Sequence, residues 1–180
     1  MIQTIGTSLY LENYYRMMEV SVIGLGYVGC VTAGCLTDYG HNVVGVDINP
    51  RKVDTINQGT SPVDEPGLDE LIENGVEKNN LKATTDTAEA IDGSDISFIS
   101  VGTPSGSDGQ LDTTNLYNVM DSVASSLSST DQHTIVVRST VPPGTTRKLR
   151  SYLLDQIDGE NIRFLINPEF LREGSAIDDF

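Results

Sequence analysis

The sequence predicts an α/β fold, a doubly wound parallel sheet with helices on both faces. Short apolar runs alternate along the chain with longer segments of helical period. These runs, such as ISFISV at 96–101, lack the strict alternation of apolar and polar residues that half-exposed strands show. Unbroken apolar strands are buried on both faces, which happens when crossover helices cover both sides of a parallel sheet. The 180 residues are enough for one domain with its own core.

Five strands and five helices are expected in alternation. The strands span 20–24, 42–47, 96–101, 134–138 and 162–166, and the helices span 27–39, 51–57, a stretch that begins at 64–66, 113–127 and 145–157. Gly40 ends the first helix, because glycine commonly follows a helix C-terminus. In the third helix acids lie at the positive end, Pro66 lies in the first turn, and Leu68, Leu71 and Ile72 share one face.

The first residues do not fit this alternation. Residues 1–17 have neither a sustained period nor cap signals, whereas Met18 opens directly onto the strand EVSVIG. We therefore expect Met18 to be the native start and residues 1–17 to be a non-native extension or a loose tail, because chain termini are often poorly ordered. A short accessory strand or helix is the alternative. Residues 18–180 then form the domain.

Composition and charge exclude several classes of function. The chain has 26 acidic and 11 basic residues, a net charge of −15, and so lacks the basic face that binds nucleic acid. No apolar run approaches the roughly 18–20 residues of a membrane span, and no signal peptide is evident, so we expect a cytoplasmic protein. Such an acidic surface is best tolerated in concentrated salt. A salt-loving source is one hypothesis, and an acidic mesophilic protein is the other.

A glycine-rich turn joins the first predicted strand to the first helix. Gly24, Gly26 and Gly29 form G-x-G-x-x-G in VIGLGYVG, and Asp47 stands at the end of the second strand. In such a Rossmann-type unit the first glycine permits the tight turn, the second lets the backbone approach a pyrophosphate, and the third allows close helix–strand packing. Backbone N–H groups at the start of the helix then hold the anion. The alternative is a glycine turn that binds nothing.

The acidic residue predicts which dinucleotide binds. The carboxylate of Asp47 would accept hydrogen bonds from the adenosine ribose hydroxyls and repel a 2′-phosphate, which favours NAD over NADP. Arg51 and Lys52 lie close enough in sequence to weaken that repulsion.

Cysteines and histidines are given no chemical role. Cys30 and Cys35 lie on the first helix among apolar neighbours, where small buried hydrophobes are expected, and they are too few for a disulfide scaffold. His41 and His133 are expected at the surface, and no metal site is expected.

Further segments go beyond a generic dinucleotide-binding domain. They are VIGLGYVG (22–29), GVDINPRKVDTINQG (45–59), VDEPGL (63–68), SVGTPSGSDGQLD (100–112), VVRSTVPPGT (136–145) and NPEFLREGSAIDDF (167–180). In this order they resemble the UDP-glucose/GDP-mannose dehydrogenase family over residues 18–180. The sequences of the VGTPS and VVRSTV segments are slightly more similar to those of its GDP-mannose 6-dehydrogenases. The resemblance implies polysaccharide biosynthesis, in which two NAD⁺ oxidise the C6 alcohol of a UDP- or GDP-sugar to a carboxylate. It also implies a homodimer of the full-length protein.

The resemblance assigns cofactor contacts to particular residues. Tyr27 and Val28 would contact the pyrophosphate, with Asp47 and Lys52 at the adenosine end. Thr103 of VGTP would lie over the cofactor at the end of its strand. Asp47 and Thr103 lie beyond the carboxyl ends of predicted strands, where open parallel sheets bind ligands.

The resemblance also assigns catalytic roles. Thr140 of RSTV would sit near the nicotinamide and help to position a water. Glu169 of NPEF resembles the general acid/base, and Glu173 resembles a glutamate near the nicotinamide and sugar. One helical turn would place these two carboxylates, four residues apart, on one side. The alternatives are a solvated loop with helix-capping acids, and a pairing of Arg172 with either acid or with a substrate phosphate.

Other parts of the family's machinery are expected beyond residue 180. They are the catalytic cysteine that traps the aldehyde intermediate, a lysine and an asparagine that bind the reacting oxygen, the long dimer helix and the second domain. Three interpretations follow. The chain is the cofactor portion of a nucleotide-sugar 6-dehydrogenase, a stand-alone NAD-binding module, or a decayed product without function.

Overall fold

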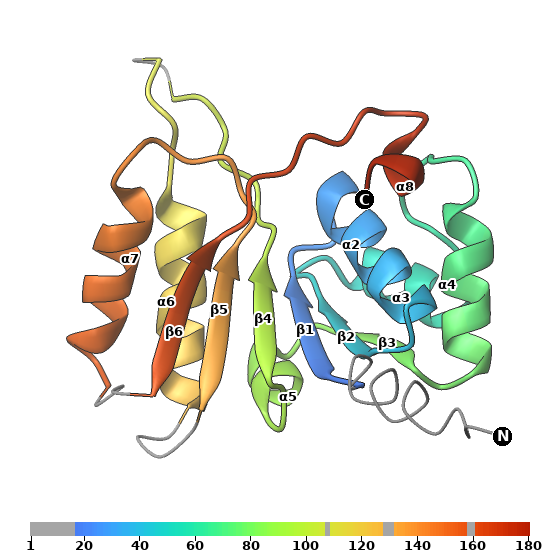
Figure 1. The fold of residues 1–180 in the computed structure, drawn as a ribbon, viewed down its shortest axis with the longest axis horizontal. Helices are drawn as coiled ribbons and strands as arrows, with labels where there is room; N and C mark the ends of the chain where they lie inside the picture. Colours follow the sequence, from blue (N-terminus) through green and yellow to red (C-terminus); the bar gives the residue numbers. More distant parts are fainter. Residues whose placement is uncertain (1–16, 107–108, 128–131, 158–160) are drawn as a thin grey trace, which may run out of the picture.

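The computed structural model describes residues 17–106, 109–127, 132–157 and 161–180. In these residues six strands run parallel in one sheet, in the order β3-β2-β1-β4-β5-β6 (Figure 1). They are β1 (Glu19–Ile23), β2 (Asn42–Val46), β3 (Leu81–Thr84), β4 (Ile96–Ile99), β5 (His133–Val137) and β6 (Ile162–Ile166). The strand order reverses between β1 and β4, which form the switch point of a doubly wound sheet. The predicted fold class is confirmed.

Helices cover both faces of this sheet. They are α2 (Tyr27–Asp38), α3 (Pro50–Asn57), α4 (Leu68–Glu77), α5 (Thr87–Ile91), α6 (Thr114–Ser126), α7 (Thr145–Leu154) and α8 (Ala176–Asp179). One buried core joins side chains of α2, α3 and α4 to the sheet, and a second core joins those of α5, α6 and α7. Neighbouring strand residues serve different cores, since Val22 belongs to the first and Ile23 to the second.

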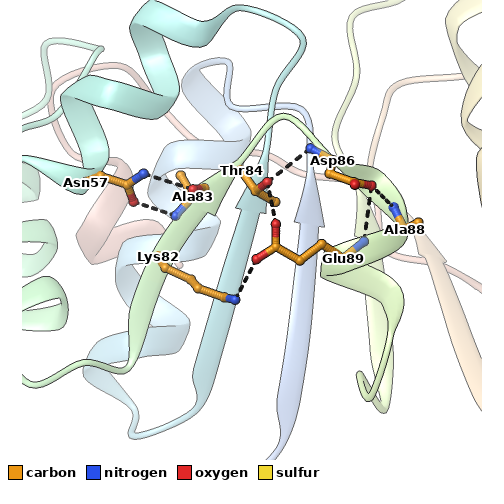
Figure 2. Close-up of polar contacts among 7 residues, drawn as sticks. All are labelled: Asn57, Lys82, Ala83, Thr84, Asp86, Ala88 and Glu89. Atoms are coloured by element: carbon orange, nitrogen blue, oxygen red, sulfur yellow. Dashed lines mark hydrogen bonds and ion pairs between the residues drawn. The ribbon is translucent and has the colours of Figure 1, made fainter.

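The edge strand β3 was not predicted, because it contains no apolar run. Its buried Leu81 and Ala83 alternate with the exposed Lys82. The side chain of Asn57 completes this edge: its amide nitrogen donates to the carbonyl of Ala83 (2.9 Å), and its oxygen accepts from the Ala83 N–H (2.7 Å; Figure 2). The amide thereby occupies backbone groups that an exposed edge strand would leave free for another strand.

A capped turn after β3 starts the short helix α5, which was also not predicted. The carboxylate of Asp86 accepts from the N–H groups of Ala88 (2.8 Å) and Glu89 (3.2 Å). Glu89 in turn pairs with Lys82 (2.9 Å) and accepts from the hydroxyl of Thr84 (2.8 Å; Figure 2). These two contacts, that with Lys82 first, lower the pKa of Glu89. Side chains therefore fix α5 to the sheet edge.

The third helix begins later than predicted. Its first turn was expected at 64–66, but α4 begins at Leu68, after Gly67 with a φ of 84°. Glu65 does not lie in the helix because its carboxylate is buried against a distant part of the backbone. The predicted apolar face is nevertheless present, since Leu68 and Ile72 are fully buried.

One histidine was placed wrongly from the sequence. His133 was expected at the surface, but it is 2% exposed at the start of β5. Its ring nitrogens contact the hydroxyl of Ser97 (2.8 Å) and the carbonyl of Ser94 (2.9 Å), and Ser97 contacts Ser21 at 2.6 Å. Hydrogen bonds to these neighbouring polar groups therefore offset the lost hydration of the buried imidazole. His41 is half-buried.

The chain crosses the carboxyl edge of the sheet after β6. Figure 1 shows residues 167–180, which we call the C-terminal strap, running along the upper edge of the sheet from β6 to α8 beside α2. Ala176 is buried in the first core, and the ring of Phe180 lies 6.2 Å from that of Tyr39. The strap thus lies above the switch point.

The predicted tail at 1–17 lies outside the described residues, except for the exposed Met17. Within the described ranges, no helix has the length and apolar character needed to cross a membrane.

Candidate functional site

Two adjoining cavities open at the carboxyl ends of the strands. The first, of about 460 Å³, is lined by Gly24, Asp47 and Lys52 among others. The second, of about 260 Å³, lies toward the strap. Gly26 and Ser100 line both cavities, so the two meet at the switch point between β1 and β4. This is where ligands bind in open α/β sheets.

The three glycines of the turn meet different surroundings. Gly24 has a φ of 99°, and a Cβ there would lie 2.8 Å from the carbonyl oxygen of Ser100. A Cβ on Gly29 would lie 1.8 Å from the carbonyl oxygen of Gly24. Nothing lies within 4 Å of the corresponding position at Gly26, which also starts α2 without a side-chain cap. The outer glycines therefore allow close packing, whereas the middle one leaves space beside the helix N-terminus for an anion.

Hydrogen bonds fix the carboxylate of Asp47 at the rim of the first cavity. One oxygen accepts from the N–H of Leu25 in the glycine turn (2.9 Å) and pairs with Lys52 Nζ (3.1 Å). The other accepts from the N–H of Asn49 (2.9 Å), while Arg51 is exposed on α3. The side chain of Asp47 is 11% exposed, so its oxygens retain access to the cavity.

Besides Gly26, the second cavity gathers five of the predicted residues. Tyr27 and Val28 from α2, Thr103 after β4, Thr140 after β5 and Glu169 from the strap all line it. The hydroxyl of Thr103 donates to the carbonyl of Thr140 at 2.9 Å and joins the two loops. The structure therefore brings together residues from four separate parts of the chain.

The predicted helical turn around Glu169 and Glu173 is wrong. Residues 167–172 have no regular secondary structure. Glu169 instead accepts from the N–H of Leu171 at 2.8 Å. Glu173 is exposed and lines neither cavity, so the two carboxylates do not share a helix face.

Arg172 forms an ion pair within the strap. Its Nη2 lies 2.6 Å and its Nε 2.9 Å from the two carboxylate oxygens of Asp179, and its backbone N–H donates to the same group at 3.0 Å. The hydrogen bonds from Arg172 lower the pKa of Asp179 to about 2. The hypothesis that Arg172 pairs with Glu169 or Glu173 is therefore wrong.

Arg138 belongs to the second cavity, although it was not singled out from the sequence. It is 7% exposed, contacts Asn167 through Nη1, and lies 5.1 Å from the ring centre of Phe180. Burial lowers the pKa of its guanidinium, while the charge of Glu169 opposes this effect. An arginine that ends a buried strand was the signal available in the sequence.

Glu65 was also missed as a functional candidate. Its carboxylate accepts from the hydroxyl of Tyr27 at 2.6 Å. Burial, and next the hydrogen bond to Glu65, raise the pKa of Tyr27 to about 12. The sequence marks this position through the segment VDEPGL, but it predicts for Glu65 only an acid at a helix start.

The expectation that Cys30 and Cys35 are small buried hydrophobes is confirmed. Cys30 and Cys35 are 0% and 4% exposed in α2. Burial raises the pKa of Cys30 to about 12 and that of Cys35 to about 11. In the part of the chain that the structure describes, no group of three or more His, Cys, Asp and Glu side chains is placed to hold a metal ion.

Sequence comparison links these features to known proteins. The profile of the UDP-glucose/GDP-mannose dehydrogenase family, NAD binding domain, matches residues 18–180. GDP-mannose 6-dehydrogenase of Pseudomonas putida is 48% identical over 168 residues, which cover 91% of this chain and 38% of that protein. UDP-glucose 6-dehydrogenase of Haloferax volcanii is 41% identical over 172 residues, with 91% and 39% covered. The chain thus spans less than half the length of these relatives.

Solved structures of dehydrogenases in this family also resemble the chain. A ternary complex of GDP-mannose dehydrogenase from Pseudomonas aeruginosa superposes with a TM-score of 0.87 at 45% identity, covering 90% of this chain and 38% of that one. UDP-glucose dehydrogenase from Pyrobaculum islandicum has a TM-score of 0.86 at 38% identity, covering 93% and 39%.

Proposed function

Because this chain belongs to the UDP-glucose/GDP-mannose dehydrogenase family, we propose that it binds NAD along its two cavities as the cofactor portion of a nucleotide-sugar 6-dehydrogenase. The observation that carries the proposal is the meeting of the cavities at Gly26. Asp47 and Lys52 lie in one cavity, and Thr140 and Glu169 lie in the other. A dinucleotide has the matching order of adenosine, pyrophosphate and nicotinamide.

The first cavity fits the adenosine and pyrophosphate. Asp47 is held at the rim by backbone donors and accepts from the ribose hydroxyls, while its charge opposes a 2′-phosphate. Lys52 supplies positive charge next to this carboxylate. The open space at Gly26 and the first-turn N–H groups of Tyr27 and Val28 accept the pyrophosphate.

The second cavity fits the reacting end. NAD, when bound, supplies the hydride acceptor. Thr103 lies over the cofactor, and Thr140 positions a water near the nicotinamide. Glu169 takes and returns protons as general acid/base. The hydrogen bond between Thr103 and the Thr140 carbonyl supports this assignment, because it fixes the two loops together. Glu173 lines neither cavity in this structure, so its proposed place near the nicotinamide and sugar rests on the family resemblance alone.

The activity proposed for the complete enzyme is the oxidation of the C6 alcohol of GDP-mannose or UDP-glucose to a carboxylate with two NAD. The higher identity to GDP-mannose 6-dehydrogenases supports the first sugar. The proposal includes a cysteine nucleophile and a second domain contributed by further chain, a homodimer, and a cytoplasmic role in polysaccharide biosynthesis.

Calorimetric titration of the chain with NAD and NADP tests the site. We expect tighter binding of NAD. Asp47→Ala should weaken the binding of NAD about 10- to 100-fold, because charge-assisted hydrogen bonds of about 1.5–3 kcal/mol are lost. The difference in affinity between NAD and NADP should also become smaller, because the repulsion of a 2′-phosphate is lost. Asp54→Ala, an equal charge change on the exposed side of α3, is the control and should bind NAD normally.

The unfolding temperature of both variants must be measured alongside, because Asp47 also bonds the glycine turn. Unchanged NAD affinity in a folded Asp47→Ala variant would remove Asp47 from the site. Absence of NAD binding by the unaltered chain would overturn the proposed function.

A further inference from the structure

Glu65 is the buried carboxylate of the described chain. It is 6% exposed, and its two oxygens accept from three donors: the hydroxyl of Tyr27 (2.6 Å), the N–H of Gly174 (2.7 Å) and the N–H of Ala176 (2.8 Å). The other acids in the described residues are exposed or half-buried. A carboxylate is tolerated at such a position only when hydrogen bonds replace its lost hydration.

These donors keep Glu65 ionised. The hydrogen bond from Tyr27 lowers the pKa of Glu65 most, followed, against the effect of burial, by those from the two N–H groups. All three are uncharged donors, so Glu65 is not one half of an ion pair. Its contacts specify positions in space, since each donor must point at a carboxylate oxygen.

The three donors belong to parts of the site that are far apart in sequence. Tyr27 is the first residue of α2 and lines the second cavity. Gly174 and Ala176 lie in the strap, five and seven residues after Glu169. Glu65 itself precedes α4, whose N-terminal end lies beside α8 in Figure 1. The carboxylate of Glu65 therefore joins the helix of the glycine turn to the segment that carries Glu169, beside a longer contact of 3.5 Å from the Tyr27 hydroxyl to the carbonyl of Arg172.

The strap depends on such contacts. Residues 167–172 have no regular secondary structure, although the N–H of Asn167 still donates to the carbonyl of Val137 at 3.0 Å. At one end Asn167 is held by Arg138. At the other end the backbone of Gly174 and Ala176 is held by Glu65. Glu169 lies between these two attachments.

We propose that Glu65 is a positioning residue that couples NAD binding at the first turn of α2 to the placement of the strap and of Glu169. The inference rests on the proposed function. NAD bound against Tyr27 restrains its ring, the ring restrains Glu65, and Glu65 restrains the strap. Because coupling between two sites is reciprocal, an ordered strap raises NAD affinity as much as NAD orders the strap.

Hydrogen exchange of the Gly174 and Ala176 amides, measured by NMR with and without NAD, tests this coupling. We expect NAD to slow exchange of both amides in the unaltered chain. In Tyr27→Phe the two amides keep their bonds to Glu65 and their slow exchange without NAD, but the further slowing by NAD is lost. In Glu65→Gln the amides exchange faster at the outset, and NAD binds about tenfold more weakly, the loss of roughly one hydrogen bond.

Glu70→Gln is the matched control, because Glu70 is an exposed acid on α4 close to Glu65. It should leave amide exchange and NAD affinity unchanged. If Glu65→Gln fails to fold, Tyr27→Phe decides alone, since it removes one hydroxyl from a half-buried ring.

The outcomes separate this inference from the proposed function. If the unaltered chain does not bind NAD, the proposed function fails and the coupling with it. If NAD binds but leaves the exchange of both amides unchanged, or slows it equally in Tyr27→Phe, the coupling is overturned and the proposed function stands.

Discussion

The two thiols of this chain lie on the helix that follows the glycine turn, packed into the core beneath it. Cys30 is fully buried, and its Sγ donates weakly to the carbonyl of Leu25 at 3.5 Å. Cys35 is 4% exposed in the same core. The thiolate is the reactive form of cysteine, and burial disfavours it. Neither side chain is therefore equipped to attack a sugar aldehyde.

We predict that both thiols resist alkylation in the folded chain. With pKa values of about 12 and about 11, on the order of one thiol in a thousand or fewer is ionised at pH 8. Iodoacetamide labelling followed by mass spectrometry should show unmodified Cys30 and Cys35, with full labelling in guanidinium as the control. The chain alone should also produce no NADH from NAD with GDP-mannose or UDP-glucose. Rapid labelling or sugar-dependent NADH would contradict the prediction.

The sequence predicts the position of some charged residues in the site but not of others. Asp47 was predicted as a site residue because it follows a strand next to the glycine turn, and its partner Leu25 lies in that turn. Glu65 and Arg138 were missed because strap residues bury them. The partner Ala176 lies 111 positions from Glu65, and periodicity carries no information about such contacts.

In the glycine turn, the same substitution of glycine by alanine should lower the stability of the fold at one position and the affinity for NAD at another. A methyl group at Gly29 would lie 1.8 Å from a backbone oxygen, so Gly29→Ala should destabilise the chain by about 3 kcal/mol or more. No atom lies within 4 Å of a Cβ placed at Gly26, so the Gly26→Ala variant should fold normally. It should bind NAD about tenfold more weakly or worse, because the methyl group occupies the space of the pyrophosphate. Thermal unfolding and calorimetry separate the two effects, and normal NAD affinity in Gly26→Ala would refute the assignment.

The Arg172–Asp179 pair makes the end of the strap sensitive to acid. In the folded chain the pKa of Asp179, about 2, lies below the ordinary pKa of an aspartate. The ion pair therefore contributes fully to stability at a pH above the ordinary pKa, and this contribution is lost as the pH falls through about 2. We predict that the Asp179 carboxyl group, followed by its ¹³C shift, is still mostly ionised at pH 3. Arg172→Gln should raise its protonated fraction at that pH, because the guanidinium bonds are lost while the backbone N–H of residue 172 still donates. A protonated Asp179 at pH 3 in the unaltered chain would show that the pair does not form in solution.

Elements could be predicted where a local pattern specifies them. β1, β2, β4, β5 and β6 are apolar runs, and each was found within two residues of its observed bounds. β3 was not, because only Leu81 and Ala83 are buried and the side chain of Asn57 completes its edge. The helical turn expected at Glu169 and Glu173 is absent, because the conformation of the strap depends on Arg138 and Glu65, which come from other elements.

Charge is the dominant property of the whole molecule. The chain has a net charge of −15, and the three ion pairs between described residues use only a few of its acids. Like charges repel across the folded surface, and the Debye length falls from about 10 Å at 0.1 M salt to about 3 Å at 1 M. Salt should therefore stabilise the fold without any specific ion site.

We predict that the unfolding temperature of the chain rises between 0.1 M and 2 M KCl, by about 2–4 °C for each kcal/mol of repulsion that is screened. The matched variant carries Asp54→Asn, Glu73→Gln and Glu77→Gln, three exposed acids on α3 and α4, which changes the net charge from −15 to −12. Its unfolding temperature should be higher at 0.1 M KCl, and it should gain less from added salt. Differential scanning calorimetry measures both quantities. Equal gains in the two proteins would show that salt acts through apolar burial or a bound ion, because only a repulsion mechanism scales with the charge removed.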